Sequence, residues 1–182
     1  THSNHVVNEL DLNCMRYFKR VIDVGEKIPV SKVVNLSSTF GTDDETKQFV
    51  TRYIRLTHCD IFFSDAVVLV EGPAEKILVP SFLVKAGLDS YYISVIEVNG
   101  RHAHSFRKLI EKIGIAALIV TDIDATDTKV GEDGKEIHPS VITAKGNGYK
   151  TGNPSIKRWL SGKEQIDDLL ALDEKEKLVN NV

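Results

Sequence analysis

Four carboxylates follow apolar runs in two separate stretches of the chain. Glu71 comes directly after the run "AVVLV", and Glu75 follows four residues later. Asp122 and Asp124 come just after a second run, "AALIV". Acids in the first turn of a helix are favoured by the helix dipole, and this alone would account for Glu75. It does not account for Glu71, which ends a buried strand, so we consider the four acids as ligands.

Carboxylates of this kind can serve phosphate chemistry if something positive lies among them. Hard divalent cations such as Mg²⁺ and Mn²⁺ prefer oxygen ligands. Two such ions ~3.5–4 Å apart can clamp a phosphodiester for in-line attack. We therefore expect a two-metal site if the fold brings both acid pairs to one place.

The predicted secondary structure around the acids indicates that the two acid pairs lie at one place. Three short apolar runs alternate with two helical patterns between residues 61 and 125, which indicates a parallel, right-handed α/β sheet. The carboxyl ends of its strands would lie on one edge, where open α/β sheets bind ligands. Residues 126–152 are rich in Gly, Lys, Asp and Thr and predict a loop-like insertion. Asn153 and Pro154 then have the types expected at the start of a further helix, which we expect to continue to the end of the chain.

The N-terminal stretch is less regular. Residues 9–22 predict a short strand followed by a charged loop, and residues 28–36 predict another strand. Thr42 and Glu45 form a capping-box pattern, with Thr42 as the expected N-cap of a helix whose apolar spacing extends to Ile61–Phe63.

Composition sets broad limits on the function. The chain has 182 residues, 42% hydrophobic residues and a net charge of −3, so it has no overall basic character typical of nucleic-acid binding. Bound cations would, however, neutralise clustered acids. Its two cysteines, Cys14 and Cys59, lack the spacing of a metal site or a disulfide framework, which favours a cytoplasmic location. No apolar run approaches the ~18 residues of a membrane span, and the polar start is not a signal peptide.

The segments "VVLVEGPAE" and "LIVTDID" together resemble the TOPRIM domain shared by topoisomerases, primases and OLD (overcoming lysogenization defect) nucleases. The E-G-x-x-E form and "TGNPSIKRWL" resemble the OLD version in particular. The resemblance implies a TOPRIM-type parallel sheet flanked by helices, with a helical and loop insertion at about 126–152. It also implies metal-dependent DNA cleavage, with metal ligands at Glu71, Glu75, Asp122 and Asp124.

Further roles follow from the same resemblance. Glu71 and Asp122 would be catalytic as well as metal-binding. The family also uses a lysine, for which Lys150 is the candidate in this sequence, unless the residue lies beyond Val182. Arg101, Arg107, Lys157 and Arg158 would hold DNA phosphates, although solvated helix faces explain the same residues equally well.

The first residues point to a larger protein. "THSNHVV", with His2, resembles the histidine switch segment of ABC-type ATPases. We therefore expect residues 1–60 to be a linker from an N-terminal ABC-type ATPase domain of the same protein, through which it forms a homodimer. Residues 61–182 would be the TOPRIM nuclease domain, truncated at its C-terminus.

Two other functions remain open from the sequence. A TOPRIM-like domain without its lysine could be a non-catalytic module for assembly or DNA binding. Alternatively, the D-x-D-x-T pattern that begins at Asp122 resembles the nucleophile motif of haloacid-dehalogenase-type phosphatases. The phosphatase interpretation leaves Glu71 and Glu75 without a role. It also needs further strands after this motif, which the remaining sequence does not predict.

Overall fold

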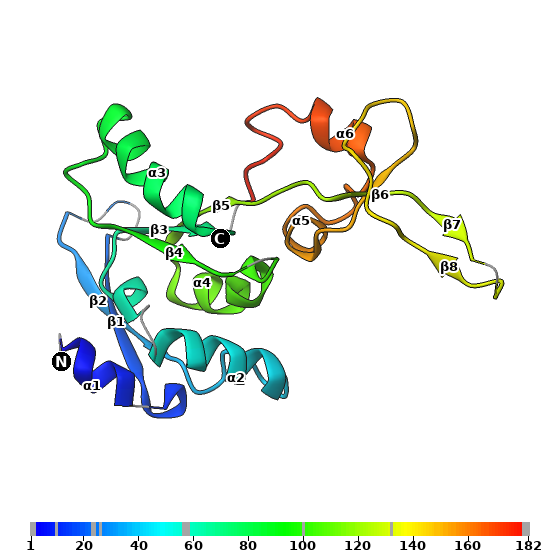
Figure 1. The fold of residues 1–182 in the computed structure, drawn as a ribbon. Coiled ribbons are helices and arrows are strands. Elements are labelled where there is room, and N and C mark those ends of the chain that lie inside the picture. Colours follow the sequence, from blue (N-terminus) through cyan, green and yellow to red (C-terminus); the bar gives the residue numbers. More distant parts are fainter. Residues whose placement is uncertain are drawn as a thin grey trace.

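The computed structural model describes residues 3–9, 11–22, 25, 27–55, 59–99, 101–131 and 133–179. Its centre is a parallel sheet of three strands in the order β4-β3-β5 (Figure 1). β3 is Ala66–Val70, β4 is Ile93–Glu97 and β5 is Ala116–Val120. Val70 pairs with Glu97 on one side and with Val120 on the other, so the three carboxyl ends lie level at one edge. The α/β fold with a parallel sheet is confirmed.

Helices cover both faces of this sheet, because the side chains of β3 alternate between two cores. Val68 and Val70 pack with Val79 of α3, Pro73–Lys85, on one face. Val67 and Leu69 belong to the largest core, on the other face, with α4, Arg107–Ile113. Figure 1 shows α3 and α4 on opposite sides of the sheet. Because β3 is the central strand, the connection after β3 and the connection after β5 lead away in different directions. The boundary between β3 and β5 is therefore the topological switch point, where open α/β sheets bind ligands.

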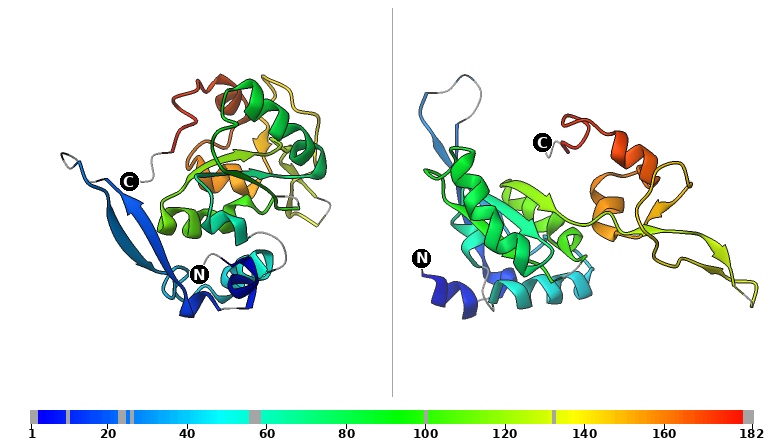
Figure 2. Two further views of the ribbon diagram at one scale, coloured as in Figure 1. Left: turned by 90° about the vertical axis from the view of Figure 1, so that its left-hand side faces the viewer. Right: turned by 45° about the horizontal axis from the view of Figure 1, so that its top comes forward.

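The N-terminal elements pack beneath the α4 face. They are α1 (Asn4–Glu9), the antiparallel hairpin β1 (Arg16–Val21) and β2 (Val30–Asn35), and α2 (Asp44–Tyr53). A short 3₁₀ helix, Cys59–Phe62, leads into β3. Buried residues of this segment, including Leu12, Val50 and Ile61, share one core with Leu69 and Ile110. Figure 2 shows the hairpin projecting from the remainder of this half.

After β5 the chain forms a smaller unit beyond the edge of the sheet (Figure 2). Two-residue strands make two antiparallel ladders, β6 (Ala125–Thr126) with β9 (Lys150–Thr151), and β7 (Lys129–Val130) with β8 (Glu136–Ile137). The helices α5 (Pro154–Trp159) and α6 (Ile166–Ala171) follow. Ala125, Ile166, Leu169 and Leu172 form the centre of its core.

Several local predictions were wrong. The N-cap of α2 is Asp43, whose side chain accepts a hydrogen bond from the Thr46 amide, and α2 ends long before Ile61. Residues 9–22 contain the end of α1, a 3₁₀ turn and the whole of the hairpin strand β1, where we expected a short strand and then a charged loop. The continuous helix expected from Pro154 onward is two short helices, because Gly162 has a φ of +83° and Gln165 is extended between them.

Proline and glycine mark several boundaries of the helices. Pro73 and Pro154 are at the first turns of their helices, where a proline lacks only a donor that would be unpaired anyway. Gly114, with a φ of +63°, ends α4 in the left-handed conformation. No helix within the described ranges is both long and apolar enough to cross a membrane. Thr1, His2 and Gly100 lie outside the described residues.

Candidate metal centre

Glu71 is held against the end of the neighbouring strand. The side-chain hydroxyl of Thr121 donates to Glu71 Oε2 at 2.6 Å, and the Asp122 amide donates to the same oxygen at 3.1 Å. These contacts exist because Val70 and Val120 are paired in register, so the next residue of each strand faces the other. The structure therefore brings Glu71 and Asp122 together at the switch point.

Glu75 turns back toward the start of its own helix. Its Oε2 accepts a hydrogen bond from the Gly72 amide at 3.1 Å, which forms the reciprocal half of a capping box. A Cβ at Gly72 would lie 3.2 Å from that oxygen, so glycine fits this close approach. The helix-start role of Glu75 is therefore real, and the same turn brings its carboxylate toward the strand ends.

The four acids influence one another electrostatically. The pKa of Asp122 is raised above its usual 3.8, first by partial burial and then by the negative charges of Glu71, Asp124 and Glu75. A carboxyl group is disfavoured as an anion when like charges surround it without compensation. This shift shows that the two acid pairs predicted from separate segments lie within one electrostatic cluster, which we call the acid cluster.

One cation lies beside the acid cluster. Arg101 Nε is 3.6 Å from Asp124 Oδ2, and Arg101 Nη1 donates to the Gly152 carbonyl at 3.2 Å. The Arg101 side chain is half exposed, so it offsets only part of the negative charge. Asp124 itself has a φ of +52°, an uncommon backbone conformation that aspartate tolerates better than most residues.

The smaller unit contributes residues whose part in the site was not predicted. Thr151 donates its hydroxyl to the Ile123 carbonyl at 2.5 Å, and the Gly152 amide donates to the Asp124 carbonyl at 2.6 Å. A Cβ on Gly152 would lie 2.8 Å from Thr126 Cγ2, so only glycine allows β9 to pack this close to the D-x-D segment. The buried Asn153 donates to the Asp122 carbonyl at 2.8 Å. In the sequence, Asn153 signals only the start of a helix.

The other predicted residues have varied surroundings. Lys150 is in β9, with an exposed side chain and a backbone oxygen that accepts from Thr126 Oγ1. Lys157 and Arg158 are exposed on α5. Arg107 pairs with Glu111 at 2.7 Å and lies 5.2 Å from the centre of the Trp159 ring, so its guanidinium already has partners.

The donor chemistry of the acid cluster fits a hard divalent cation, because its ligand atoms are carboxylate oxygens whose charges repel one another. Within the part of the chain that is described, however, no three His, Cys, Asp or Glu side chains converge closely enough to hold a metal ion. The acids are therefore neighbours at one edge, and a bound ion would require their side chains to close on it.

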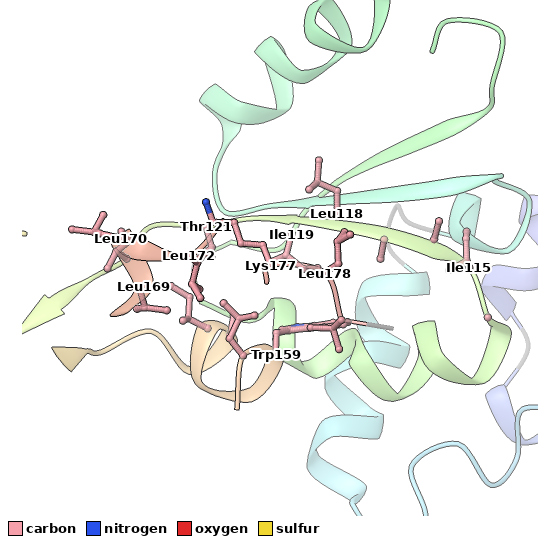
Figure 3. Close-up of a pocket in the computed structure, with 18 residues that line it drawn as sticks. Ile115, Leu118, Ile119, Thr121, Trp159, Leu169, Leu170, Leu172, Lys177 and Leu178 are labelled. Carbon is pink, nitrogen blue, oxygen red and sulfur yellow. The ribbon is translucent and has the colours of Figure 1, made fainter. Parts of the chain in front are cut away.

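A cavity of about 740 Å³ runs along the outer side of β5 (Figure 3). Its walls are mostly apolar and come from β5, α5, α6 and the segment that contains Lys177 and Leu178. Thr121 lines it near the acid cluster, and the Trp159 ring lies across it. The indole nitrogen of Trp159 is buried and has no hydrogen-bond partner in this structure.

Comparisons with known proteins match the part of the chain that contains the acid cluster. Residues 62–124 match the model of the "Overcoming lysogenization defect protein-like, TOPRIM domain". Over 180 residues the chain is 29% identical to "Endonuclease GajA" of Bacillus cereus (strain HuB5-5). The alignment covers 93% of this chain and 25% of that protein. The chain thus spans about a quarter of the length of this relative. The match to the domain model includes Glu71, Glu75, Asp122 and Asp124, so the segment that carries the acid cluster is similar to the OLD-like TOPRIM domain.

Proposed function

We propose that this chain is the nuclease part of an OLD-type protein and cleaves DNA phosphodiesters in a reaction that depends on divalent metal ions. The observation that carries the proposal is the hydrogen bond from the Asp122 amide to Glu71 at the switch point, inside a cluster where burial and then the neighbouring charges raise the pKa of Asp122. The similarity to a protein named endonuclease supports the choice of reaction.

In this proposal, Glu71, Glu75, Asp122 and Asp124 would hold two Mg²⁺ or Mn²⁺ ions. The ions would neutralise charge on the scissile phosphate and lower the pKa of water. Glu71 Oε2 is occupied by two hydrogen bonds, so Oε1 is the oxygen left to bind a ligand or accept a proton. Lys150 would place its ammonium group against developing negative charge on the phosphate.

Arg101, Lys157 and Arg158 would hold DNA phosphates beside the acid cluster. Arg101 bridges Asp124 and Gly152, and α5, which carries Lys157 and Arg158, begins at the residue after Asn153. Arg107 would act mainly by supporting α5, because its guanidinium contacts Trp159 and donates to the Arg158 carbonyl. Its substitution should therefore weaken DNA binding less than that of Lys157.

The proposed partners are DNA and an N-terminal ABC-type ATPase domain of the same protein, through which the protein would form a homodimer. The proposed location is the cytoplasm, where thiols stay reduced; Cys14 and Cys59 are free. The boundaries of residues 1–60 as linker and 61–182 as nuclease domain belong to the same proposal.

The phosphatase alternative receives less support. After β5, the described residues form only two-residue antiparallel strands and short helices, so the later parallel strands of that fold are not among them. A non-catalytic TOPRIM module would share the acid cluster but would not cleave DNA. An activity measurement separates these possibilities.

The test is nicking of supercoiled plasmid by the purified chain with Mg²⁺, Mn²⁺ or Ca²⁺. Glu71→Gln and Asp122→Asn keep side-chain shape but remove charge, and each should lower the rate at least 100-fold. We expect this loss to exceed the roughly 10–100-fold typical of residues that only orient metal ligands. Asp89→Asn is the matched control, because Asp89 is an exposed acid in the turn after α3, at the opposite edge of the sheet.

Metal-dependent nicking that persists in both acid variants would remove the site assignment. Turnover of small phosphate esters with plasmid left intact would favour the phosphatase. Binding of Mn²⁺ without any nicking would favour the non-catalytic module.

A further inference from the structure

Asn153 is buried between the smaller unit and the end of β5. Its side chain is completely inaccessible to solvent, and its backbone amide donates to Thr151 Oγ1 at 3.0 Å. Buried polar side chains are stabilising only when their hydrogen-bonding groups are satisfied. Each contact of the Asn153 amide therefore matters for the position of its neighbours.

The orientation of this amide is determined by its role as a helix cap. The Ser155 amide of α5 donates to Asn153 Oδ1 at 2.9 Å. Since a backbone N–H can only donate, the atom that faces it must be the oxygen. The NH₂ group must then point the other way, toward the D-x-D segment.

The NH₂ group faces three acceptors on that side. Nδ2 lies 2.8 Å from Thr121 Oγ1, 2.8 Å from the Asp122 carbonyl and 3.3 Å from Asp124 Oδ2. An NH₂ group has two hydrogens. The two short contacts use them, and Asp124 shares the weaker third interaction.

Thr121 passes this orientation on to Glu71. Nδ2 cannot accept, so the Thr121 hydroxyl accepts from Asn153 and turns its single proton to Glu71 Oε2, 2.6 Å away. The resulting relay has one direction, from Asn153 to Thr121 to Glu71. Hydrogen bonds in such a chain polarise and strengthen one another.

The relay selects which carboxylate oxygens are available. Glu71 Oε2 receives the Thr121 hydroxyl and the Asp122 amide, which leaves Oε1. Asp124 Oδ2 faces both Asn153 Nδ2 and Arg101 Nε, which leaves Oδ1. One buried amide thus acts on acids from two different strand ends.

We infer that Asn153 is a positioning residue that orients Glu71 through Thr121, and Asp124 by direct contact, for binding a divalent cation. This inference rests on the proposed function, because it assumes that the acid cluster binds metal. It assigns Asn153 a role beyond that of a helix cap.

Uncharged substitutions separate the helix-cap role of Asn153 from its role in the relay. Asn153→Ser keeps a good N-cap residue but removes the NH₂ donors, and Thr121→Val removes the hydroxyl at nearly constant shape. Asn147→Ser is the matched control, since Asn147 is exposed in the loop before β9. Mn²⁺ affinity of each chain is measured by titration calorimetry, at a temperature well below unfolding of every variant.

We expect Asn153→Ser and Thr121→Val each to weaken Mn²⁺ binding about 10–100-fold, the usual effect of losing an outer hydrogen-bond partner of a metal ligand. The double variant should be little weaker than Asn153→Ser alone, because Thr121→Val breaks a relay that Asn153→Ser has already broken. The side-chain amide resonances of Asn153 should shift in Thr121→Val, and in the wild-type chain on addition of Mg²⁺. A role in folding alone would produce neither the shared loss nor the shift with Mg²⁺.

Wild-type affinity in Asn153→Ser, or losses that simply add in the double variant, would overturn the relay while leaving the proposed function intact. A wild-type chain that binds no Mn²⁺, or a Glu71→Gln variant that binds it equally well, would remove the proposed function and the inference with it.

Discussion

At the scale of single residues, Asp122 connects metal binding with stability. Its pKa in the folded chain is raised, so folding favours the protonated form. This contribution to stability is present below the unfolded pKa near 3.8 and is lost as the pH rises through the folded pKa. At neutral pH without divalent ions, the ionised Asp122 therefore destabilises the fold.

We predict that Asp122→Asn raises the unfolding temperature of the metal-free chain at pH 7, and that this gain shrinks below about pH 4. Mn²⁺ should raise the unfolding temperature of the wild-type chain more than that of the variant, because ligands that bind only the folded state stabilise it. Differential scanning calorimetry with and without chelator measures both effects. A lower unfolding temperature for the metal-free variant at pH 7 would contradict the repulsion within the acid cluster.

The predictable residues of the site are those with a local signal. Glu71 and Asp122 follow apolar runs, and parallel pairing places such residues at one edge. Asn153 has an equally local signal, but only for its cap. Its second role depends on Thr121 and Asp124, which are distant in sequence, so no spacing could reveal it. The Arg101–Asp124 pair was missed for the same reason.

At the scale of elements, the start of α2 has a stabilising cap. Asp43 accepts from the Thr46 amide at 3.2 Å and pairs with Lys108 of α4 at 2.9 Å. These hydrogen bonds, first that from Lys108, lower the pKa of Asp43 from 3.8 to about 2. The stability that depends on its charge is thus present above the unfolded pKa and is lost as the pH falls toward about 2.

We predict that Asp43→Ala lowers the unfolding temperature at pH 7 and that Thr42→Ala changes it little. The difference between wild type and Asp43→Asn should disappear as the pH falls from about 4 to about 2. Thermal unfolding followed by circular dichroism measures this. An equal loss in Thr42→Ala would restore Thr42 as the cap; the two neighbouring residues are both good caps, so the sequence alone did not separate them.

Element prediction succeeded where hydrophobic burial dominates. β3, β4 and β5 are strands because their apolar runs cross a sheet that has a core on each face. Such runs are easy to recognise in the sequence. The ladders β6–β9 and β7–β8 have two residues in each strand, too few to show any period. The break between α5 and α6 depends on Gly162, a single residue in an otherwise helical pattern.

At the scale of the whole molecule, the largest core does not stop at the proposed boundary between residues 60 and 61. Val50 and Ile54 from the N-terminal side share that core with Phe106 and Leu109. Removal of residues 1–60 would therefore expose apolar surface of the central sheet and α4. The intact chain is the proper form for each measurement described above.

The two halves of the acid cluster are attached to parts of the molecule that are packed differently. Glu71 and Asp122 extend from β3 and β5, paired strands beneath two cores, whereas Asp124 is tied to β9 of the smaller unit by the Gly152 amide. Local opening of that unit would free Asp124 while the sheet stayed closed. Hydrogen exchange should then show the amides of Thr151 and Gly152 exchanging well before those of Val68 and Leu69, with Mn²⁺ slowing the first pair most. Equal rates for both pairs would mean that the acid cluster opens only when the whole fold does.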